Sequence, residues 1–547
     1  MRAGFDSMND LVVIQTAQGL AKYLLETFTK KSDRQRGIVL GFDGRHNSER
    51  FAQLSACVFL NEGFPVWLFS KMVPTPFVPF TILNKGCLAG IMVTASHNPK
   101  DDNGYKVYWT NGAQIISPHD KNIQAKILEN LEPLESSWNL SLLASEILRD
   151  PFEEMFHLYF KKMLQQIPDK YIKCNAESDA KFVYSAMHGV GYPFIMEAFK
   201  KAKLPAVLPV VEQKDPDPDF PTVKFPNPEE GKSSLVLSCN LADKNDVKVI
   251  LANDPDADRL ACAEKNPRTG QWKVFTGNEL GALLGWWSVK CFTENNPGVS
   301  LTDCYVLSST VSSKILLSMS KIDGFNFIET LTGFKWMGNK CAELIEAKKN
   351  IIFAFEEAIG FMVSPAVLDK DGISAACHLA TLCCFLNKEN LTLEEKLNQL
   401  YEKYGYHYTL TSYYICYDPA LIKRIFERIR NFNNIKNNYP TSVMNEKFKI
   451  ESVRDLTTGT DTSREDGKAL LPSSASTQMI TFQFQNGVVV TLRTSGTEPK
   501  IKYYAEMCAA PGDKDWNKLK ETLNMIVNAI VEDFLQPTVN NLIPKSD

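Results

Sequence analysis

Hydrophobic and polar residues are arranged along the N-terminal part of the chain as in linked helices and strands. Apolar residues at helical spacing predict a helix over residues 10–28. Continuous apolar runs predict buried strands at 37–43, 66–69 and 88–93. Strands that alternate with helices in this way favour a parallel sheet covered on both faces.

The same alternation recurs twice and then gives way to another pattern. Further strands are predicted at 181–186, 247–252, 305–308, 325–328 and 351–355. Near the C-terminus, alternating residues at 479–484 and 488–492 flank Asn486-Gly487, a strong β-hairpin signal, and a last helix is predicted over 515–534. The fold class is therefore α/β, with three similar α/β domains and a C-terminal α+β domain. We predict domains at residues 1–149, 150–285, 286–404 and 405–547.

Composition narrows the class of protein without identifying it. Hydrophobic residues make up 44% of the 547 residues and charged residues 23%, as in an ordinary globular protein. A net charge of −4 gives no indication of nucleic-acid binding. The 13 cysteines are scattered without a Cys-x-x-Cys pair, which fits reduced thiols in the cytosol. No apolar run reaches the length of a membrane span, and the N-terminus shows no signal core.

The predicted strand at 88–93 ends at a loop of small and polar residues, Thr94-Ala95-Ser96-His97-Asn98-Pro99. Open α/β sheets bind ligands beyond the carboxyl ends of their strands. Ser96 in such a place is a candidate nucleophile, and His97 could act as its base or orient it. The alternative is an ordinary Ser/Asn/Pro turn between a strand and a helix.

A second polar loop follows the strand at 247–252. Asp254, Asp256 and Asp258 alternate there, so their carboxylates can turn toward one point and bind a hard divalent cation. Magnesium suits the loop, because it accepts few carboxylates and completes its shell with phosphate oxygens or water. Arg259 beside them could hold a phosphate or a carboxylate. The alternative is a solvated acidic turn.

Three further segments are compatible with sugar-phosphate binding, each with a plainer alternative. Residues 493–497, with Lys502 nearby, combine a guanidinium, hydroxyls and a glycine, which suits a phosphate cradle or an ordinary Ser-Gly-Thr turn. Glu356 and Glu357 could accept hydrogen bonds from a polyol or begin a solvated helix. The spacing around Lys370 does not distinguish a site residue from a charged surface residue.

In their order along the chain, these segments together resemble the α-D-phosphohexomutase superfamily. The match comprises 94–99 (its phosphoserine loop), 254–259 (its magnesium loop), 333–335 with 356–358 (its sugar-specificity segments) and 493–497 (its phosphate-binding loop). Segments 331–338, 369–372 and 493–504 most resemble the phosphopentomutase branch, which is close to the glucose-1,6-bisphosphate synthases.

The resemblance implies four domains around a central cleft and a role for each matched residue. Ser96 would carry a phosphoryl group, and Mg²⁺ would be held by that phosphate with Asp254, Asp256 and Asp258. Arg259 and Lys370 would line the cleft, Lys370 as a proton-transfer residue. The sugar would be contacted by Thr332, Gly333, Glu356 and Ala358. The phosphate that does not react would be held by Arg493, Ser495, Gly496, Thr497 and Lys502.

The implied activity is intramolecular phosphoryl transfer through a phosphoserine and a sugar bisphosphate. It would interconvert ribose or deoxyribose 1-phosphate with the 5-phosphate, and glucose 1-phosphate with the 6-phosphate. It would need Mg²⁺ and a primer, either glucose 1,6-bisphosphate or ribose 1,5-bisphosphate. The partners would be small-molecule sugar phosphates, with no nucleic acid and no membrane, and we expect a cytosolic monomer.

Two departures from the family pattern keep alternatives open. Ala358 stands where many phosphoglucomutases have serine, which removes one sugar contact and is consistent with relaxed or pentose-directed specificity. The family begins with a Gly-Thr-Ala-Gly-Leu-Arg-like segment, and this sequence starts at Met1-Arg2-Ala3, just past it, so we expect an N-terminal truncation. The alternatives are a glucose-1,6-bisphosphate synthase that uses 1,3-bisphosphoglycerate, and a non-catalytic sugar-phosphate-binding protein.

Overall fold

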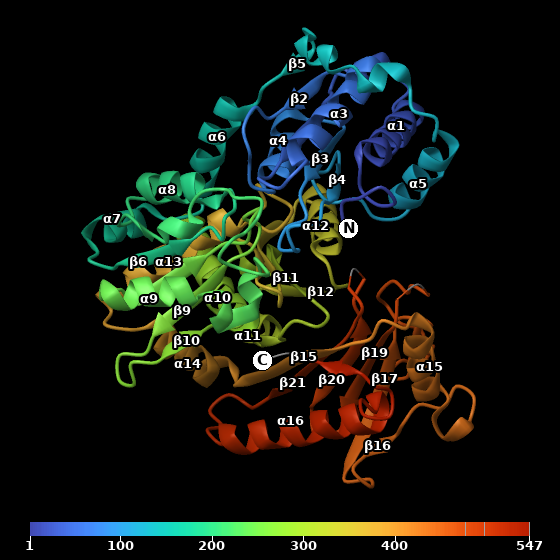
Figure 1. Cartoon of the computed structure of the whole chain (residues 1–547). Helices are drawn as coiled ribbons and strands as arrows, with labels where there is room; N and C mark the ends of the chain where they lie inside the picture. Colours follow the sequence, from blue (N-terminus) through green and yellow to red (C-terminus); the bar gives the residue numbers. More distant parts are fainter. Residues whose placement is uncertain (476, 497, 546–547) are drawn as a thin grey trace. The chain divides into compact units, whose positions relative to one another are not determined.

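The computed structural model describes residues 1–475, 477–496 and 498–545 (Figure 1). The chain forms two compact units. The first comprises Met1–Ser309 with Asp323–Leu397, and the second comprises Thr310–Ile322 with Asn398–Asp547. Each unit is described separately below.

The first sheet of the first unit has the strand order β4-β3-β1-β2-β5. Its strands are β1 (Ile38–Phe42), β2 (Val66–Leu68), β3 (Ala89–Val93), β4 (Tyr105–Trp109) and β5 (Leu148–Arg149). Leu40 and Ile91 pack with α1 (Asp10–Thr27) and α3 (Ser48–Asn61) in one core. Gly41 lies against Val78 of α4 (Phe77–Lys85), on the other face. Burial on both faces explains the continuous apolar runs of these strands.

The next two sheets of this unit repeat the plan. The second has the order β10-β9-β8-β6-β7 and the third the order β12-β11-β13-β14. Their strands are β6 (Phe182–Ser185), β7 (Leu208–Pro209), β8 (Val249–Ala252), β9 (Ala261–Lys265), β10 (Trp272–Val274), β11 (Cys304–Ser309), β12 (Asn326–Thr330), β13 (Asn350–Glu356) and β14 (Gly360–Met362).

Each of these three sheets is mixed, which corrects the prediction of a purely parallel sheet. β4 pairs antiparallel with β3, β9 with β8, β10 with β9, and β14 with β13. In each sheet the antiparallel strand comes soon after the loop that ends a parallel strand. A direct return of this kind needs no crossover helix, so it leaves no helical signal in the sequence.

The helices of the first unit connect and cover these sheets. They further include α2 (Lys31–Arg34), α5 (His119–Glu129), α6 (Phe152–Leu164), α7 (Asp169–Glu177), α8 (Gly191–Lys201), α9 (Val236–Lys244), α10 (Gly277–Asn295), α12 (Phe334–Glu346) and α13 (Gly372–Lys388). Two more helices, α11 (Ile315–Asp323) and α14 (Leu393–Tyr404), contain residues assigned to both units. Cys383 and Cys384 are buried in α13, and all 13 cysteines are free.

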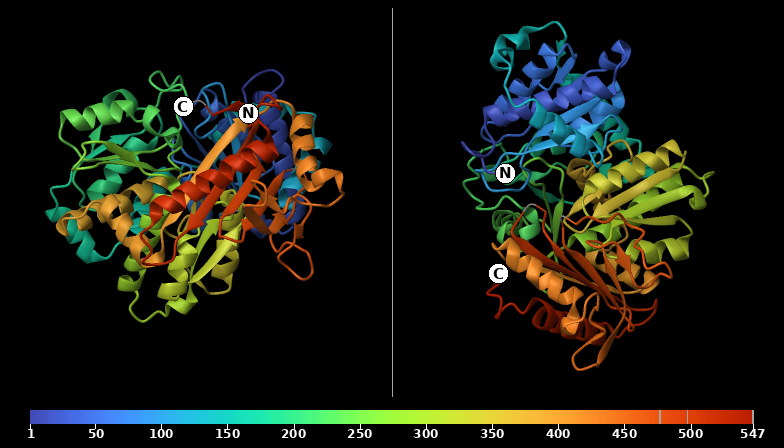
Figure 2. Two further views of the ribbon diagram at one scale, coloured as in Figure 1. Left: turned by 90° about the horizontal axis from the view of Figure 1, so that it is seen from below. Right: turned by 90° about the vertical axis from the view of Figure 1, so that its right-hand side faces the viewer.

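The second unit is built on one antiparallel sheet of eight strands, as predicted for an α+β domain. They are β15 (His407–Ile415), β16 (Ser442–Val443), β17 (Phe448–Asp455), β18 (Thr460–Asp461), β19 (Met479–Phe484), β20 (Val489–Thr494), β21 (Lys500–Cys508) and β22 (Ile543–Pro544). Gly487, with φ of +82°, makes the predicted hairpin turn between β19 and β20. Helices α15 (Pro419–Arg430) and α16 (Trp516–Ile530) share one core with the sheet (Figure 2).

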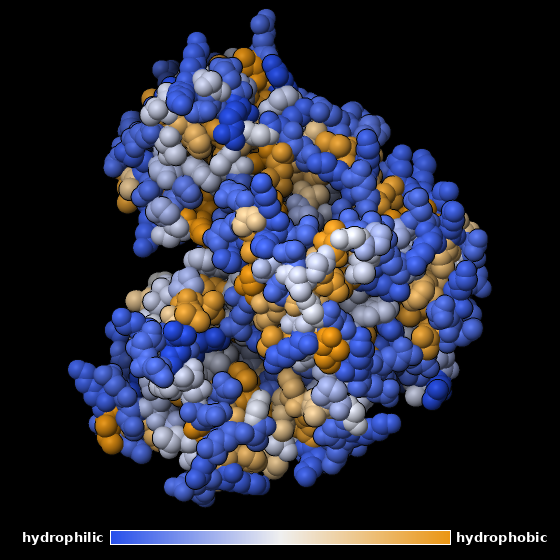
Figure 3. Space-filling view, turned by 180° about the vertical axis from the view of Figure 1, so that it is seen from behind, coloured by the Kyte–Doolittle hydropathy of each residue, from blue (hydrophilic) through white to orange (hydrophobic). Residues whose placement is uncertain are grey.

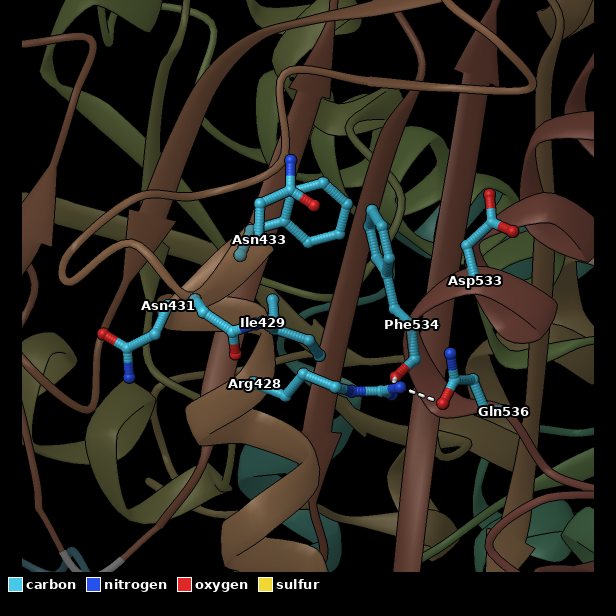
Figure 4. A pocket seen from close by; sticks show the side chains of 9 residues that line it. Arg428, Ile429, Asn431, Asn433, Asp533, Phe534 and Gln536 are labelled. Atoms are coloured by element: carbon cyan, nitrogen blue, oxygen red, sulfur yellow. Dashed lines mark hydrogen bonds between the residues drawn. The ribbon is translucent and has the colours of Figure 1, made fainter.

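The end of α15 is tied to the turn that follows α16. Arg428 donates to the Gln536 side-chain oxygen and, at 2.5 Å, to the Phe534 carbonyl, beside a pocket of 210 Å³ (Figure 4). The guanidinium is thus engaged by the C-terminal segment.

Most of the surface seen in Figure 3 is hydrophilic, with scattered hydrophobic residues. Over the residues that the structure describes, we find no helix with both the length and the apolar character needed to cross a membrane.

Candidate active site

The Ser96 loop begins where β3 ends, at the carboxyl edge of the first sheet. Ser96 has φ of +52°, a left-handed conformation that is uncommon for a residue with a side chain. Its backbone N–H donates to Thr94 Oγ1 at 2.8 Å, which stabilises this tight turn. The Thr94 N–H donates to the Gly104 carbonyl at 3.1 Å and fixes the start of the loop.

Arg45 stabilises this loop through hydrogen bonds to its backbone carbonyls, a role that the sequence analysis missed. Its guanidinium donates to the carbonyls of Ser96 and Asn98 at 2.6 Å each, and to that of Pro99 at 2.8 Å. Arg45 is 4% exposed, and its Nε lies 3.4 Å from the Asp43 carboxylate just after β1. Because parallel strands β1 and β3 are neighbours, Arg45 can reach the loop from the adjacent strand end.

The aspartate loop follows β8 in the second sheet, and it meets Ser96. The Ser96 hydroxyl donates to Asp254 Oδ2 at 2.8 Å. The other oxygen of Asp254 accepts from the Arg259 backbone N–H at 3.0 Å. Thr75, just before α4, donates its hydroxyl to Asp256 Oδ2 at 2.6 Å and its N–H to the Asp256 carbonyl at 2.9 Å. The structure therefore brings the predicted nucleophile and the predicted magnesium loop together.

The turn after β6 supports the aspartate loop by close packing. A Cβ at Gly189 would lie only 2.2 Å from the Cα of Pro255, so no larger residue fits without movement. The Val190 N–H donates to the Pro255 carbonyl at 2.9 Å. His188 is 3% exposed, and its Nε2 is hydrogen-bonded to Thr222 Oγ1 at 2.7 Å, which indicates a structural role.

The three carboxylates form a candidate cation site. Asp254, Asp256 and Asp258 are fully buried, and each has an oxygen within 4.8 Å of one on the others. Asp256 Oδ1 and Asp258 Oδ1 have no hydrogen-bond partner among the described residues. Buried polar atoms are rarely left unpaired, and carboxylate oxygens suit a hard cation such as Mg²⁺, so the donor set fits this ion.

The electrostatics of the cluster show the crowding of negative charge. Burial, and then Asp256 and Asp258, raise the pKa of Asp254 well above its ordinary value. Burial acts in the same direction on Asp256, but the charge of Lys106 and the hydrogen bonds from Lys106 and Thr75 together outweigh burial, and the pKa of Asp256 is lowered. Positive charge is therefore needed to keep all three groups ionised.

Lys106 on β4 supplies part of that charge and is a second residue that the sequence analysis missed. Its Nζ lies 2.7 Å from Asp256 Oδ2 and 2.8 Å from Asp258 Oδ2. The one available signal was a single lysine in the otherwise apolar run Tyr105–Trp109. Since the antiparallel strand itself was not predicted, its inward-facing position could not be inferred.

Lys370, Glu356 and Arg259 extend the same network. Lys370 Nζ lies 3.4 Å from Asp258 Oδ2 and 3.6 Å from Glu356 Oε1. Arg259 Nη1 lies 3.1 Å from Glu229 Oε2, and its Nε 3.9 Å from Asp254 Oδ2. Glu356 ends strand β13 and is 9% exposed, so it is not the start of a solvated helix. Lys370, whose side chain is 11% exposed, is not a solvated loop residue.

His97 adjoins the Ser96 hydroxyl without a strong bond to it. His97 Nδ1 lies 3.3 Å from Ser96 Oγ. Removal from water, and then the Arg259 cation, lower the pKa of His97 well below its usual value. The imidazole is therefore neutral at physiological pH and suits orientation of the hydroxyl.

The remaining sugar-binding candidates of the first unit lie in loops after neighbouring strands. Thr332 and Gly333 follow β12, and Gly333, with φ of +98°, precedes α12. Ala358 lies in the turn between β13 and β14. In the described part of the chain, no hydrogen bond joins these three residues to the aspartates.

The predicted phosphate-binding residues lie in the second unit. Arg493 and Lys502 are directly opposite each other on β20 and β21. The Ser495 N–H donates to the Lys500 carbonyl at 2.9 Å, which closes the loop that holds Gly496. Thr497 lies outside the described residues. Two basic side chains opposite each other repel, so a bound anion would stabilise this pair.

Comparison with known proteins identifies the family. The chain matches the phosphoglucomutase/phosphomannomutase alpha/beta/alpha domain I over residues 1–133, domain II over 157–270 and domain III over 276–404. It therefore belongs to the phosphoglucomutase/phosphomannomutase family.

The relatives point to a particular branch. Human phosphopentomutase is 54% identical over 555 residues, covering 100% of this chain and 89% of that protein. Human glucose 1,6-bisphosphate synthase is 50% identical over 554 residues, covering 100% and 88%. The crystal structure of Paramecium parafusin, a phosphoglucomutase in its open form, shares the fold with a TM-score of 0.68 at 20% identity, covering 96% of this chain and 92% of that one. The protein is an enzyme of the mutase type, an isomerase that moves a phosphoryl group.

Proposed function

We propose that this mutase interconverts ribose or deoxyribose 1-phosphate with the 5-phosphate, and glucose 1-phosphate with the 6-phosphate. The identity to phosphopentomutase along the whole chain supports the pentose substrates. The observation that carries the mechanism is the hydrogen bond of 2.8 Å from Ser96 Oγ to Asp254, which places a hydroxyl against the carboxylate cluster.

In the proposed reaction, Ser96 carries a phosphoryl group at rest. A sugar-phosphate hydroxyl attacks the phosphorus, the bond from phosphorus to Ser96 Oγ breaks, and a sugar bisphosphate forms. The bisphosphate reorients within the site, so that its other phosphoryl group faces Ser96. That group is transferred to Ser96 Oγ, and the isomeric monophosphate leaves. A sugar bisphosphate primer, glucose 1,6-bisphosphate or ribose 1,5-bisphosphate, would phosphorylate Ser96 initially.

Charged side chains of the first unit stabilise the transferred group. Burial disfavours the charged form of Lys370, but Asp258 and Glu356 outweigh it and raise the Lys370 pKa. The raised pKa keeps Lys370 protonated. In the proposed reaction it would give its proton to the departing Ser96 oxygen, and the amine so formed would accept the proton of the attacking sugar hydroxyl; on the return step the Ser96 hydroxyl would lose its proton to the amine and the departing sugar oxygen would gain one. Arg259 and Lys106 add positive charge where phosphoryl oxygens would lie, and His97 orients the hydroxyl.

Asp254, Asp256 and Asp258 would hold Mg²⁺ together with the phosphate on Ser96. When bound, this ion supplies positive charge that withdraws electron density from the phosphoryl oxygens. The fit rests on the two buried oxygens of Asp256 and Asp258 that have no partner among the described residues.

Substrate recognition would be divided between the sugar and the distal phosphate. Thr332, Gly333, Glu356 and Ala358 would contact the sugar. The phosphate that does not react would be held by Arg493, Ser495, Gly496, Thr497 and Lys502. Recognition by way of the phosphate explains how a pentose and a hexose can share one site.

The test compares rates on ribose 1-phosphate, deoxyribose 1-phosphate and glucose 1-phosphate, with Mg²⁺ and primer. Ser96→Ala should abolish turnover of all three substrates, and the phosphorylated form of the protein should disappear from its intact-mass spectrum. Ser141→Ala, at an exposed position, should change neither result. Normal rates in Ser96→Ala would refute the nucleophile. Binding of sugar phosphate without turnover in the unaltered protein would instead support the non-catalytic alternative.

A glucose-1,6-bisphosphate synthase is the second candidate, favoured by the 50% identical relative. It would transfer a phosphoryl group from 1,3-bisphosphoglycerate to glucose 1-phosphate. With that donor, accumulation of glucose 1,6-bisphosphate faster than glucose 6-phosphate would identify the synthase. The reverse ratio would identify the mutase.

A further inference from the structure

One cavity in the first unit is lined by residues that the proposed reaction does not use. It has a volume of 480 Å³ and lies among α6, α10, α13 and the beginning of β13. Its polar lining includes Lys162, Ser288, Lys349 and His378, beside the apolar side chains of Ile351 and Ile352. The volume is in the range of small-molecule sites.

Two buried polar side chains in this cavity have no partner. His378 is 1% exposed, and neither of its ring nitrogens is hydrogen-bonded within the described ranges of the chain. Ser288, 4% exposed, has an equally unpartnered Oγ over those same ranges. Buried polar groups nearly always find a partner, so these atoms indicate a ligand with polar groups of its own. Both line the same cavity, although they come from different helices.

Positive charge lies at the same cavity. Lys162 Nζ donates to the neutral Asn84 Oδ1 at 2.6 Å, and Lys162 forms no ion pair among the described residues. Lys349 is 3.0 Å from Asp303, so much of its charge is already balanced. Lys162 is therefore the cation that an incoming anion would meet.

We propose that this cavity is a binding site for a small phosphate monoester that also carries free hydroxyl groups. The phosphate pairs with Lys162, and the hydroxyl groups hydrogen-bond with Ser288 and His378. Burial lowers the pKa of His378 to about 4, so its ring is neutral at pH 7. A neutral imidazole offers one donor and one acceptor, which matches a hydroxyl better than it matches an anion.

The position of the cavity gives this site a route to the proposed active site. Residues 350–352 of the lining begin β13, and the same strand ends at Glu356. His378 belongs to α13, which begins at Gly372, two residues after Lys370. A ligand in the cavity would thus contact the strand that carries Glu356 and the helix that begins two residues after Lys370. The site itself does not depend on which sugar phosphate the enzyme converts.

The test uses glycerol 3-phosphate as the probe and the ring signal of His378 as the readout. The chain has 7 histidines, so a ¹H–¹³C spectrum of protein labelled at histidine Cε1 is simple, and His378→Gln assigns the signal. Glycerol 3-phosphate should shift that signal saturably, and glycerol at the same concentration should not. The shift should persist in the double variant Arg493→Ala/Lys502→Ala, which lacks the two basic residues proposed to hold a phosphate at the active site.

Variants identify the groups responsible. Lys162→Ala should weaken the apparent affinity roughly tenfold, as expected for loss of a charge-assisted bond, and Ser288→Ala should weaken it severalfold. Lys161→Ala, at an exposed neighbouring position on α6, should leave the affinity within about twofold. Thermal unfolding confirms that each variant is folded. An unmoved His378 signal, or equal affinities of the two lysine variants, would overturn the proposal.

Discussion

Replacement of Arg45 tests whether the geometry of the Ser96 loop limits turnover. Arg45 does not reach the reacting atoms in the proposed mechanism, yet it donates to the carbonyls of Ser96, Asn98 and Pro99. Arg45→Lys keeps the charge but not the planar fork that reaches several carbonyls at once. Arg45→Met removes the charge as well and leaves Asp43 buried without its cation.

The expected size follows from the bonds that are lost. A lysine can replace only part of this set, so we count two lost bonds, those of 2.6 Å to Ser96 and Asn98. At roughly 1.5–3 kcal/mol for each bond to a charged group, their loss weakens the loop by about 3–6 kcal/mol. If the loop must be reordered in every turnover, kcat falls roughly 10²- to 10⁴-fold.

Stability and positioning can be separated with Asp43. Arg45→Met should lower the free energy of unfolding by about 3–5 kcal/mol, because it leaves a buried carboxylate unpaired. Asp43→Asn combined with Arg45→Met removes that carboxylate and should recover much of the stability but not the turnover. The measurements are kcat on glucose 1-phosphate and urea unfolding. The reasoning fails if Arg45→Lys keeps kcat within threefold, or if the double variant recovers turnover together with stability.

Three further predictions concern other parts of the first unit. Burial raises the pKa of Glu264 from 4.5 to about 7, so the native state disfavours ionisation and stability falls as pH rises from 4.5 to 7. The free energy of unfolding of Glu264→Gln, measured in urea, should therefore rise relative to that of the unaltered protein as the pH increases over this range, by up to roughly 3 kcal/mol. A difference between the two proteins that does not change with pH would contradict this. Lys106→Met should show a larger rise in Tm on addition of Mg²⁺ than the unaltered protein, because the carboxylates lose their internal cation; equal rises would count against the cation site. Gly189→Ala should destabilise the fold by about 1–3 kcal/mol and slow turnover, since the added methyl meets Pro255 at 2.2 Å, whereas Gly298→Ala, with open space around it, should do neither.

The sequence was sufficient to predict β3 and β8, the strands that precede the loops of Ser96 and Asp254. Both strands are buried on two faces, so each shows as an apolar run that stops at polar residues. The two strands belong to different sheets, so the meeting of their loops followed only from the family resemblance and not from the strand pattern. The hairpin at Gly487 was also predictable, because its turn chemistry is local.

The partners of these loops could not be predicted, because they depend on contacts far apart in the chain. Lys106 and Asp256 are 150 positions apart, and Arg45 reaches backbone carbonyls, which carry no sequence signal. The edge strand β4 itself escaped prediction, since Tyr105–Trp109 is a short half-buried run without strict alternation. The charge balance of the aspartate cluster therefore became visible only in three dimensions.

The cluster also explains why sugar specificity can vary within one chemistry. Ser96, Lys106, the three aspartates and Lys370 are linked through charged contacts in the first unit, so each constrains the next. Of the residues proposed to contact the sugar, Glu356 belongs to this network through Lys370, whereas Ala358 offers only a methyl group in the turn between β13 and β14. In the proposed site, alanine in place of serine at position 358 would remove one hydroxyl contact to the sugar and would leave the phosphoryl contacts unchanged. Ala358→Ser should accordingly raise kcat/KM for glucose 1-phosphate relative to ribose 1-phosphate, and an unchanged ratio would place specificity elsewhere.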